Sequence, residues 1–337
     1  MENYSEKWMA RALEFAKEGW GTATPNPSVG AVAVKDGEFL GGAPSQPGGG
    51  PHAEATLLRE LGEKAKGADL FVTLEPCSHF GKNPPCTLAI QKAKIKRVFV
   101  AIADENPQVS GNDLLRREGI EVQTGILKEQ AEAMYSGFFH FIKTGRTRVV
   151  VKIAETQNGV MAKKDGPLAI TGSKANEYTG FLRGRAQAIV VSTRTAQIDN
   201  PRLNLHSDTS GWIHPPKPVL FGRNTPNLSK PNFEKGNRES RAFLFSEGEL
   251  VQNFSSMVLL LSQEGIHEIF VEPGPKLAKA LVQAGVWDHL HIYQSKNVVE
   301  EGISWRSEDD SHSSIPGELV NLGPIGDDTH FFFTNEP

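Results

Sequence analysis

The stretch "FVTLEPCSHFGKNPPC" occupies residues 71–86 and decides how the N-terminal half of the chain is interpreted. It begins with an apolar run typical of a buried strand and continues into a proline-rich loop that holds Cys77 and Cys86. These are the two cysteines of the 337-residue sequence. A single pair cannot build a disulfide framework for so long a chain, so we expect a cytoplasmic protein whose cysteines bind a metal or take part in catalysis.

Length and composition limit the classes of function. A chain of 337 residues is too long for one ordinary core, which predicts two domains. The net charge of -4 offers no basic excess for nucleic acid, and no apolar run reaches the roughly 18 residues of a membrane span. The N-terminal segment has mixed charge and lacks the pattern of a signal peptide. We therefore expect a small-molecule partner and neither a nucleic acid nor a membrane.

Helical and strand-like segments alternate along the first 145 residues. Apolar periodicity, glycine caps and proline at helix starts define their positions. This alternation predicts an α/β layer fold. The predicted elements are helices over 5–18 and 52–67, a helix from Pro84-Pro85 to about Lys94, and strands over 28–34, 69–75 and 97–103.

A second alternating series begins after the stretch 143–148, where we place a domain boundary. The two predicted domains span 1–145 and 148–337. The region 206–240 around the 218–222 strand is rich in Pro, Ser and Asn and is expected to be loop or disordered, and the tail 300–329 is weakly patterned. The predicted strands of the second domain are 148–154, 187–192, 218–222, 241–246, 268–272 and 289–294.

One histidine joins the two cysteines in a pattern that suits zinc. His52 opens a helix, Cys77 follows a strand, and Cys86 opens another helix, where the helix dipole favours a thiolate. Three protein ligands with one open position are typical of catalytic zinc. Glu54 lies two residues from His52 and is better placed to hold the water that zinc activates, and to move its proton, than to ligate.

The combined pattern is the His-x-Glu and Pro-Cys arrangement of zinc nucleobase deaminases. The eight residues between Cys77 and Cys86 depart from the usual Cys-x-x-Cys spacing. Two alternatives remain open from the residues alone: a structural zinc site that recruits a fourth ligand such as His79, and a pair of buried thiols.

At this point the sequence resembles the bifunctional deaminase–reductase family of riboflavin biosynthesis. The resemblance is carried by "TPNPSVGAV" (24–32), "GGPHAE" (49–54), the stretch 71–86 and "DENPQVSG" (104–111). It implies a cytidine-deaminase-like three-layer domain followed by a dihydrofolate-reductase-like α/β domain. It also implies a phosphoribosylated diaminohydroxypyrimidine as substrate, zinc on the three ligands above, and Glu54 as the proton shuttle.

The same resemblance implies that Asn26, His79 and Lys82 contact the substrate. An asparagine amide can read a pyrimidine edge, and the two basic residues lie in the inter-cysteine loop, where a phosphate could be met. Asn26 could instead cap a turn, and Lys82 could be solvated surface. The family usually carries a histidine shortly before Gly-Gly-Pro-His, but this chain has Ser45 and Gln46 there.

The second domain is expected to bind a nicotinamide cofactor without a Rossmann fingerprint, since no Gly-x-Gly-x-x-Gly follows a strand there. Two strand–turn–helix segments could hold phosphate, at 187–201 and 269–281. Arg194 could meet the extra phosphate of NADP, or could be an ordinary surface arginine.

The resemblance extends over about 148–294 to the reductase domain of the family, with NADPH as cofactor. It implies two sets of site residues. The substrate set is Arg183, Asp199, Asn200, Leu203 and Glu272, and the cofactor set is Ala154, Thr171, Ser192, Thr195, Asp199 and Gly274.

Several polar positions of the reductase half depart from the family. Thr156 and Asn158 replace Ser and Asp, Asn200 replaces Asp, His206 replaces Arg, and Pro273 replaces Gly. Replacing Asp by Asn removes a charge and any acid–base role. Replacing Arg by His weakens phosphate binding, and replacing Gly by Pro removes a backbone N–H that a phosphate could use. They lead to the hypothesis that this half is weakly active.

Three functions follow. The first is a bifunctional enzyme that deaminates the pyrimidine and then reduces its ribosyl group to ribityl with NADPH. The second is a deaminase whose C-terminal domain is weak or non-catalytic. The third is a non-catalytic zinc-binding scaffold, against which Glu54 argues. We also expect a homo-oligomer, either a dimer or a tetramer.

Overall fold

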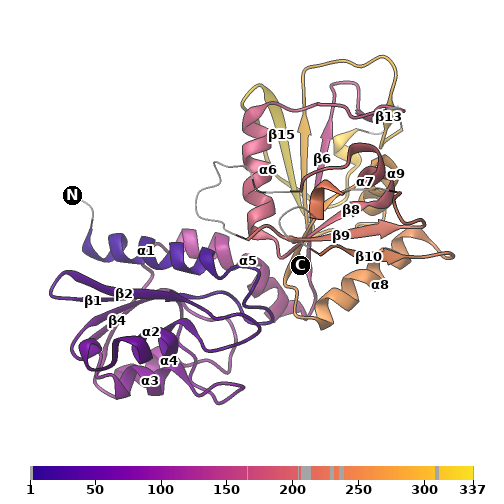
Figure 1. Ribbon diagram of the computed structural model, residues 1–337. Coiled ribbons are helices and arrows are strands. Elements are labelled where there is room, and N and C mark those ends of the chain that lie inside the picture. Colours follow the sequence, from indigo (N-terminus) through magenta and orange to yellow (C-terminus); the bar gives the residue numbers. More distant parts are fainter. Residues whose placement is uncertain are drawn as a thin grey trace. The chain divides into compact units, whose positions relative to one another are not determined.

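The computed structural model describes residues 3–164, 166–203, 205, 214–227, 231–234, 239–307 and 311–336. The chain separates into two compact units at the junction of Thr144 and Gly145 (Figure 1). Each unit is described by itself. Among the described residues, no helix combines the length and the apolar character that a membrane span requires.

The first unit is a five-stranded sheet between two helical layers. The strand order is β2-β1-β3-β4-β5, in which β1 runs antiparallel to its neighbours and the last three strands are parallel. Helices α1 and α5 cover one face, and α2, α3 and α4 cover the other (Figure 1). The elements are α1 (Tyr4–Glu18), β1 (Gly30–Lys35), β2 (Glu38–Pro44), α2 (Ala53–Leu61), η1 (Gly62–Ala65), β3 (Asp69–Leu74), α3 (Cys86–Lys92), β4 (Arg97–Ile102), α4 (Gly111–Arg117), β5 (Glu121–Thr124) and α5 (Lys128–Thr144).

The elements of the first unit follow from local sequence. In α1, Met9, Ala12 and Ala16 recur at helical spacing and are buried, and Asn3 caps the first turn. Every residue of β3 is buried, as its apolar run predicts for a central strand. The helix predicted over 52–67 ends at Leu61, because Gly62 takes a positive φ of 53° and the chain continues as a 3-10 turn.

The second unit is an eight-stranded sheet with helices on both faces. The strand order is β10-β9-β8-β11-β6-β12-β15-β14, and β15 and β14 are the antiparallel strands. One apolar cluster joins α6 and α7 to the sheet, and another joins α8 and α9 to its opposite face. The elements are β6 (Arg148–Glu155), β7 (Val160–Ala162), α6 (Ser173–Arg185), β8 (Ala188–Ser192), α7 (Thr193–Asp199), β9 (Lys217–Gly222), η2 (Asn232–Glu234), β10 (Arg241–Leu244), α8 (Leu250–Gln263), β11 (Glu268–Glu272), α9 (Pro275–Gln283), β12 (His289–Gln294), β13 (Ile303–Ser304), η3 (His312–Ser314), β14 (Glu318–Ile325) and β15 (Asp328–Thr334).

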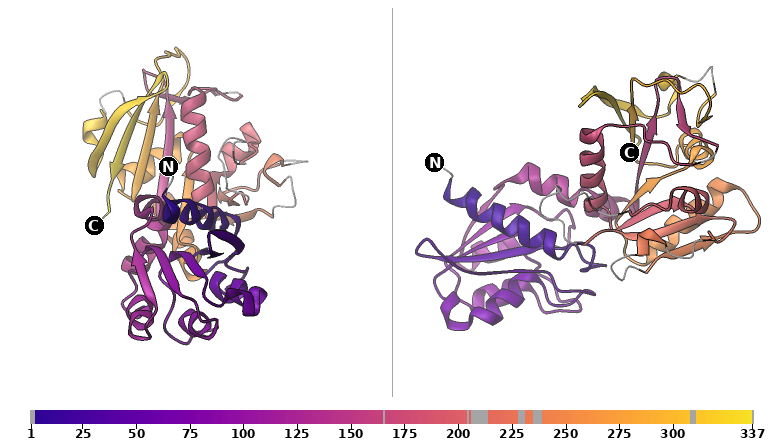
Figure 2. Two further views of the ribbon diagram at one scale, coloured as in Figure 1. Left: turned by 90° about the vertical axis from the view of Figure 1, so that its left-hand side faces the viewer. Right: turned by 45° about the horizontal axis from the view of Figure 1, so that its top comes forward.

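Two expectations about weakly patterned segments need correction. The tail 300–329 contains β13, β14 and the start of β15, and the β14–β15 hairpin forms one edge of the sheet (Figure 2). Most of β14 is exposed at the sheet edge, so its sequence lacks the alternation that marks a half-buried strand. Within 206–240, η2 interrupts the predicted loop, while 206–213, 228–230 and 235–238 lie outside the described residues.

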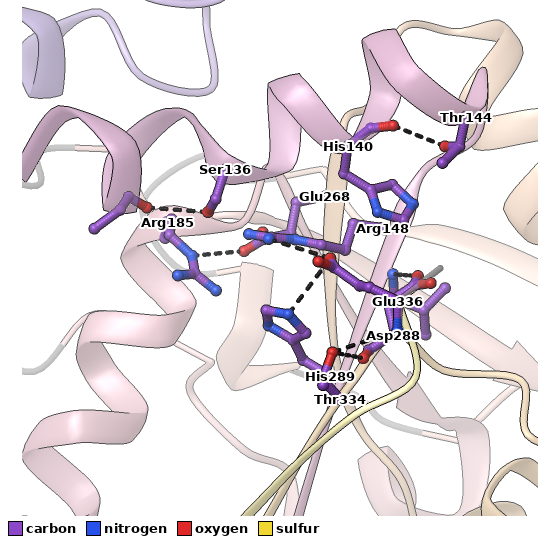
Figure 3. Close-up of polar contacts among 12 residues, drawn as sticks. Ser136, His140, Thr144, Arg148, Arg185, Glu268, Asp288, His289, Thr334 and Glu336 are labelled. Atoms are coloured by element: carbon purple, nitrogen blue, oxygen red, sulfur yellow. Dashed lines mark hydrogen bonds and ion pairs between the residues drawn. The ribbon is translucent and has the colours of Figure 1, made fainter. Parts of the chain in front are cut away.

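A buried ion-pair cluster fixes the start of β6. Arg148, whose side chain is 2% exposed, donates from Nε to the Glu268 carboxylate at 2.7 Å, and Arg185 Nε donates to the same group at 2.9 Å. Figure 3 shows the two arginines converging on Glu268. Burial alone would raise the pKa of Glu268, but the two guanidinium groups lower it from 4.5 to about 2.

The Glu268→Gln substitution is expected to destabilise the second unit by about 3 kcal/mol at neutral pH, because it leaves buried Arg148 without its main counter-charge. A folded-state pKa below the unfolded value gives stability that is present above the unfolded pKa and is lost as pH falls towards 2. Urea unfolding at several pH values measures this difference. Glu264→Gln, which breaks the exposed pair with Arg241, is the matched control and should change little.

Candidate metal centre and reductase site

The three predicted zinc ligands converge in the first unit. His52 is the N-cap of α2, Cys77 follows β3, and Cys86 is the first residue of α3. Their ligand atoms all lie within 4.8 Å of one another. His52 Nδ1 is 3.4 Å from Cys77 Sγ and 3.2 Å from Cys86 Sγ. The sequence therefore brings one imidazole and two thiols to one point from three separate elements.

The donor set and its spacing fit zinc. Bonds of about 2.3 Å to sulfur and 2.0–2.1 Å to nitrogen in a tetrahedron place S and N roughly 3.5 Å apart, close to the distances found here. Among the described residues, the cluster of metal-ligating side chains consists of these three alone. His79 is exposed and lies outside it, so the structure gives no support to a four-ligand site that uses this histidine.

The two cysteines differ in how readily their thiols lose a proton. The side chain of Cys86 and its backbone N–H, 3.2 Å away at the start of α3, both hydrogen-bond to Cys77 Sγ. The Cys86 side-chain hydrogen bond is the largest cause that lowers the pKa of Cys77, to about 4, while the same contact and burial raise the pKa of Cys86. One thiolate is thus formed readily, as a soft metal requires of its ligands.

Glu54 is the buried acid of this centre. It lies in the first turn of α2 and is 2% exposed. Its Oε2 has no hydrogen-bond partner among the described residues, which is costly for a buried oxygen. Burial is the largest cause that raises the pKa of this carboxyl. An unsatisfied carboxyl beside three ligands suits a group that takes and returns a proton.

Glu75 holds the strand end from which Cys77 projects. Its carboxylate accepts hydrogen bonds from the backbone N–H groups of Asn112 at 2.9 Å and Asp104 at 3.4 Å. Gly111 allows this closure, because a Cβ there would lie 1.8 Å from the carbonyl oxygen of Pro76. Sequence reasoning missed this role, although an acidic residue directly after an apolar strand is a usable signal.

Two of the predicted substrate residues lie around one glycine. A Cβ placed on Gly49 would be 3.8 Å from Asn26 Nδ2 and 3.9 Å from Lys82 Nζ. Asn26 Nδ2 is also 3.5 Å from His52 Nε2, and Lys82 Nζ donates to the Gly48 carbonyl at 2.9 Å. These two side chains therefore flank the loop that leads into the metal centre. The side chain of His79 is exposed.

Ser45 and Gln46 occupy the place of the family's histidine. Ser45 is 5% exposed, and its Oγ accepts from Val29 N at 3.0 Å. Gln46 Nε2 donates to the Pro44 carbonyl at 3.0 Å. Both side chains hold the backbone of this loop.

The second unit contains a cavity of about 360 Å³ beyond the carboxyl ends of β8, β9 and β11. This edge of a parallel sheet is where α/β proteins bind ligands. Four of the predicted reductase residues line the cavity, namely Ser192, Thr195, Asp199 and Gly274. Arg194, Arg223 and Lys276 add positive charge to its lining, which suits a phosphorylated ligand.

The cavity floor is built from two strand–helix turns. Ser192 is the N-cap of α7: its Oγ accepts from Thr195 N at 3.0 Å and lies 2.7 Å from Thr195 Oγ1. Gly274 is the N-cap of α9, and a Cβ on it would lie 3.1 Å from Thr195 Oγ1. The absence of a side chain at Gly274 allows the two turns to lie this close together.

Arg183 and Glu272 form a separate polar cluster. Arg183 Nε donates to the Glu272 carboxylate at 2.8 Å, and both side chains are largely buried. Lys152 lies over the ring of Tyr293, and burial, aided by Arg183 and opposed by Glu272, lowers the pKa of its ammonium. The family motif on this strand retains Lys152, but sequence reasoning gave this lysine no role of its own.

The other predicted reductase residues lie apart from the cavity. Leu203 is 1% exposed and belongs to the apolar cluster under α6, because a leucine at that position fills the core. Asn200 ends α7 in the left-handed region and accepts from Asn232 N at 2.7 Å. Ala154 is half-buried on β6, and Thr171 precedes α6, where its Oγ1 lies 3.4 Å from Asn176 Oδ1.

The departure at Asn158 has a structural explanation. Its Nδ2 donates to the Val299 carbonyl at 2.8 Å and its Oδ1 accepts from Val299 N at 3.3 Å. An aspartate could accept but not donate, so the amide is the group that pairs with both sides of this backbone. The departure at His206 lies outside the described residues.

Comparison with known proteins assigns each of the two units to a protein family. The model of the cytidine and deoxycytidylate deaminase zinc-binding region matches residues 2–102, and the RibD C-terminal domain matches residues 147–298. Riboflavin biosynthesis protein RibD of Escherichia coli is 35% identical over 317 residues, which cover 86% of each chain. The chain belongs to the RibD family. The RibD protein of Aquifex aeolicus is 34% identical over 94% of this chain and 96% of its own length.

Solved RibD structures agree with this assignment. Acinetobacter baumannii RibD has a TM-score of 0.74 at 29% identity, and the alignment covers 98% of each chain. The Thermotoga maritima diaminohydroxyphosphoribosylaminopyrimidine deaminase/5-amino-6-(5-phosphoribosylamino)uracil reductase has a TM-score of 0.75 at the same identity and coverage. The expected fold, a cytidine-deaminase-like domain followed by a reductase domain, is confirmed, and the expected cofactors zinc and NADPH agree with RibD membership.

Proposed function

We propose that the first unit removes the amine of a diaminohydroxyphosphoribosylaminopyrimidine by hydrolysis, and that the second reduces the ribosyl group of the product to ribityl. The substrate class comes from the name of the Thermotoga maritima relative. The observation that carries the first step is the buried carboxyl of Glu54, whose Oε2 has no hydrogen-bond partner among the described residues, beside three converging ligands.

Each residue of the deaminase site has a distinct role in this proposal. His52, Cys77 and Cys86 would hold zinc, which supplies Lewis acidity and activates water at neutral pH. Glu54 would take a proton from the hydrolytic water and deliver it to the leaving amine, a role that its raised pKa suits.

Substrate binding falls to the residues around Gly49. Asn26 presents an amide to the pyrimidine edge, and Lys82 neutralises phosphate at the exposed side of the site. His79, exposed in the same loop, adds a second donor there.

In the reductase unit, NADPH would occupy the cavity formed by β8, β11 and their following helices. Ser192, Thr195 and Gly274 would contact its phosphates, and Asp199 also lines the cavity. The ribosyl group would lie toward the cluster of Arg183, Glu272 and Lys152. The cofactor supplies the hydride and these residues supply placement.

We further propose a cytoplasmic homo-oligomer, as a dimer or tetramer. The sheet edge at β14 supports this, because Leu319, Val320 and Leu322 are each about half exposed on an edge strand. The two cysteines are not joined to each other, which fits a reducing compartment.

The Glu54→Gln substitution should lower ammonia release by roughly 10²–10⁴-fold, because the proton shuttle is lost while the ligands remain. Zinc content, measured by elemental analysis, should stay near that of the wild type, and NADPH oxidation on the deaminated substrate should be unaffected. Ammonia release that persists at the wild-type rate would remove Glu54 from the mechanism.

Separate assays on the purified chain test the two activities. We expect ammonia release from the pyrimidine without NADPH, and NADPH oxidation with the deaminated product. Arg183→Lys should raise KM for the deaminated product and leave ammonia release unchanged, since it disturbs the bidentate contact with Glu272. Ammonia release without NADPH oxidation in the wild type would favour the alternative of a deaminase with a non-catalytic second domain.

A further inference from the structure

A buried carboxylate that belongs to neither site lies at the end of β6. Glu155 is 0% exposed. It accepts hydrogen bonds from four side chains. These are Gln294 Nε2 at 2.8 Å, Trp305 Nε1 at 2.7 Å, Arg306 Nη2 at 2.8 Å and His312 Nε2 at 2.9 Å.

Three of these donors lie about 150 residues further along the chain, Trp305 and Arg306 in the segment 303–307 and His312 in η3. Burial of the carboxyl is opposed by His312, Arg306 and Trp305, which together lower the pKa of Glu155. A buried carboxylate is strongly unfavourable without such partners. The segment therefore cannot move away from β6 without leaving a buried charge unpaired.

The same segment forms one wall of the cavity. Ile303 pairs with Ala162 and Ser304 pairs with Val160, so β13 and β7 make a two-stranded ribbon. Met161, Ala162 and Ile303 of this ribbon line the cavity. Trp305, the first residue after β13, is 4% exposed and packs into the core under α9.

The ribbon is held on two sides. Before β7, Asn158 exchanges two hydrogen bonds with the backbone of Val299. After β13, Trp305 and Arg306 bind Glu155, and Arg306 lies so close to Gly159 that a Cβ there would be 3.3 Å from Arg306 Nε. Glu155 itself is not among the residues that line the cavity, so its effect on a ligand must pass through the ribbon.

We propose that Glu155 is a positioning residue for NADPH: it fixes the β7–β13 ribbon as the apolar wall against which the cofactor packs. This inference rests on the assignment of the cavity to NADPH under the proposed function. Because Glu155 acts on cofactor binding, its substitution affects the affinity for NADPH far more than the rate of hydride transfer.

The test compares Glu155→Gln and Trp305→Phe with the wild type. NADPH Kd is measured by fluorescence titration, KM and kcat by NADPH oxidation, and ammonia release serves as an internal control. We expect Glu155→Gln to raise both Kd and KM for NADPH about tenfold, and Trp305→Phe about threefold, with kcat within about twofold and ammonia release unchanged. Glu264→Gln, at an exposed ion pair, should leave every value unchanged.

The outcomes separate the inference from the function on which it rests. A wild type that does not bind NADPH contradicts the proposed cofactor site. A wild type that binds NADPH while both variants keep its Kd and KM overturns the role of Glu155, even if their melting temperatures fall. Should Glu155→Gln fail to fold, Trp305→Phe decides, because it removes one N–H donor and keeps an aromatic ring in the core.

Discussion

The deaminase unit depends on one constraint: three ligand atoms from three elements must meet within 4.8 Å. Two of them, His52 and Cys86, stand at the starts of α2 and α3, so two helix N-termini point at the same place. Two positive dipole ends that converge favour negative charge between them, and the Cys77 thiolate provides it. The Glu75 carboxylate then fixes the end of β3, so that Cys77 completes the set.

The reductase unit is organised around β6 in a comparable way. This strand lies inside the sheet, and its first and last residues, Arg148 and Glu155, are both buried charges. Arg148 fixes the N-terminal end through Glu268, and Glu155 fixes the C-terminal end through the segment after β13. The strand that carries Lys152 is thereby held at both ends beside the predicted substrate cluster.

The sequence predicted the parts of this molecule that depend on local pattern. The helix at 5–18 and the strand at 69–75 carry clear periodicity, and the zinc ligands combine rare residue types with proline at element ends. Glu155 could not be found in this way, because three of its four partners lie 150–157 residues away in a tail without pattern.

The departures from the family pattern show the same limit. Compared with the family's aspartate, Asn158 lacks an acidic group, which suggests a loss of function. Its amide, however, pairs with both the N–H and the carbonyl of Val299. The deciding partner is a residue that no local window of sequence contains.

X-ray absorption at the zinc edge of the purified full-length chain tests the central claim most directly. The structure predicts one nitrogen and two sulfur ligands from the protein and one light atom from solvent, with the same spectrum in a His79→Ala variant. A spectrum with two imidazoles, changed by His79→Ala, would make the site structural and would contradict the role given to Glu54.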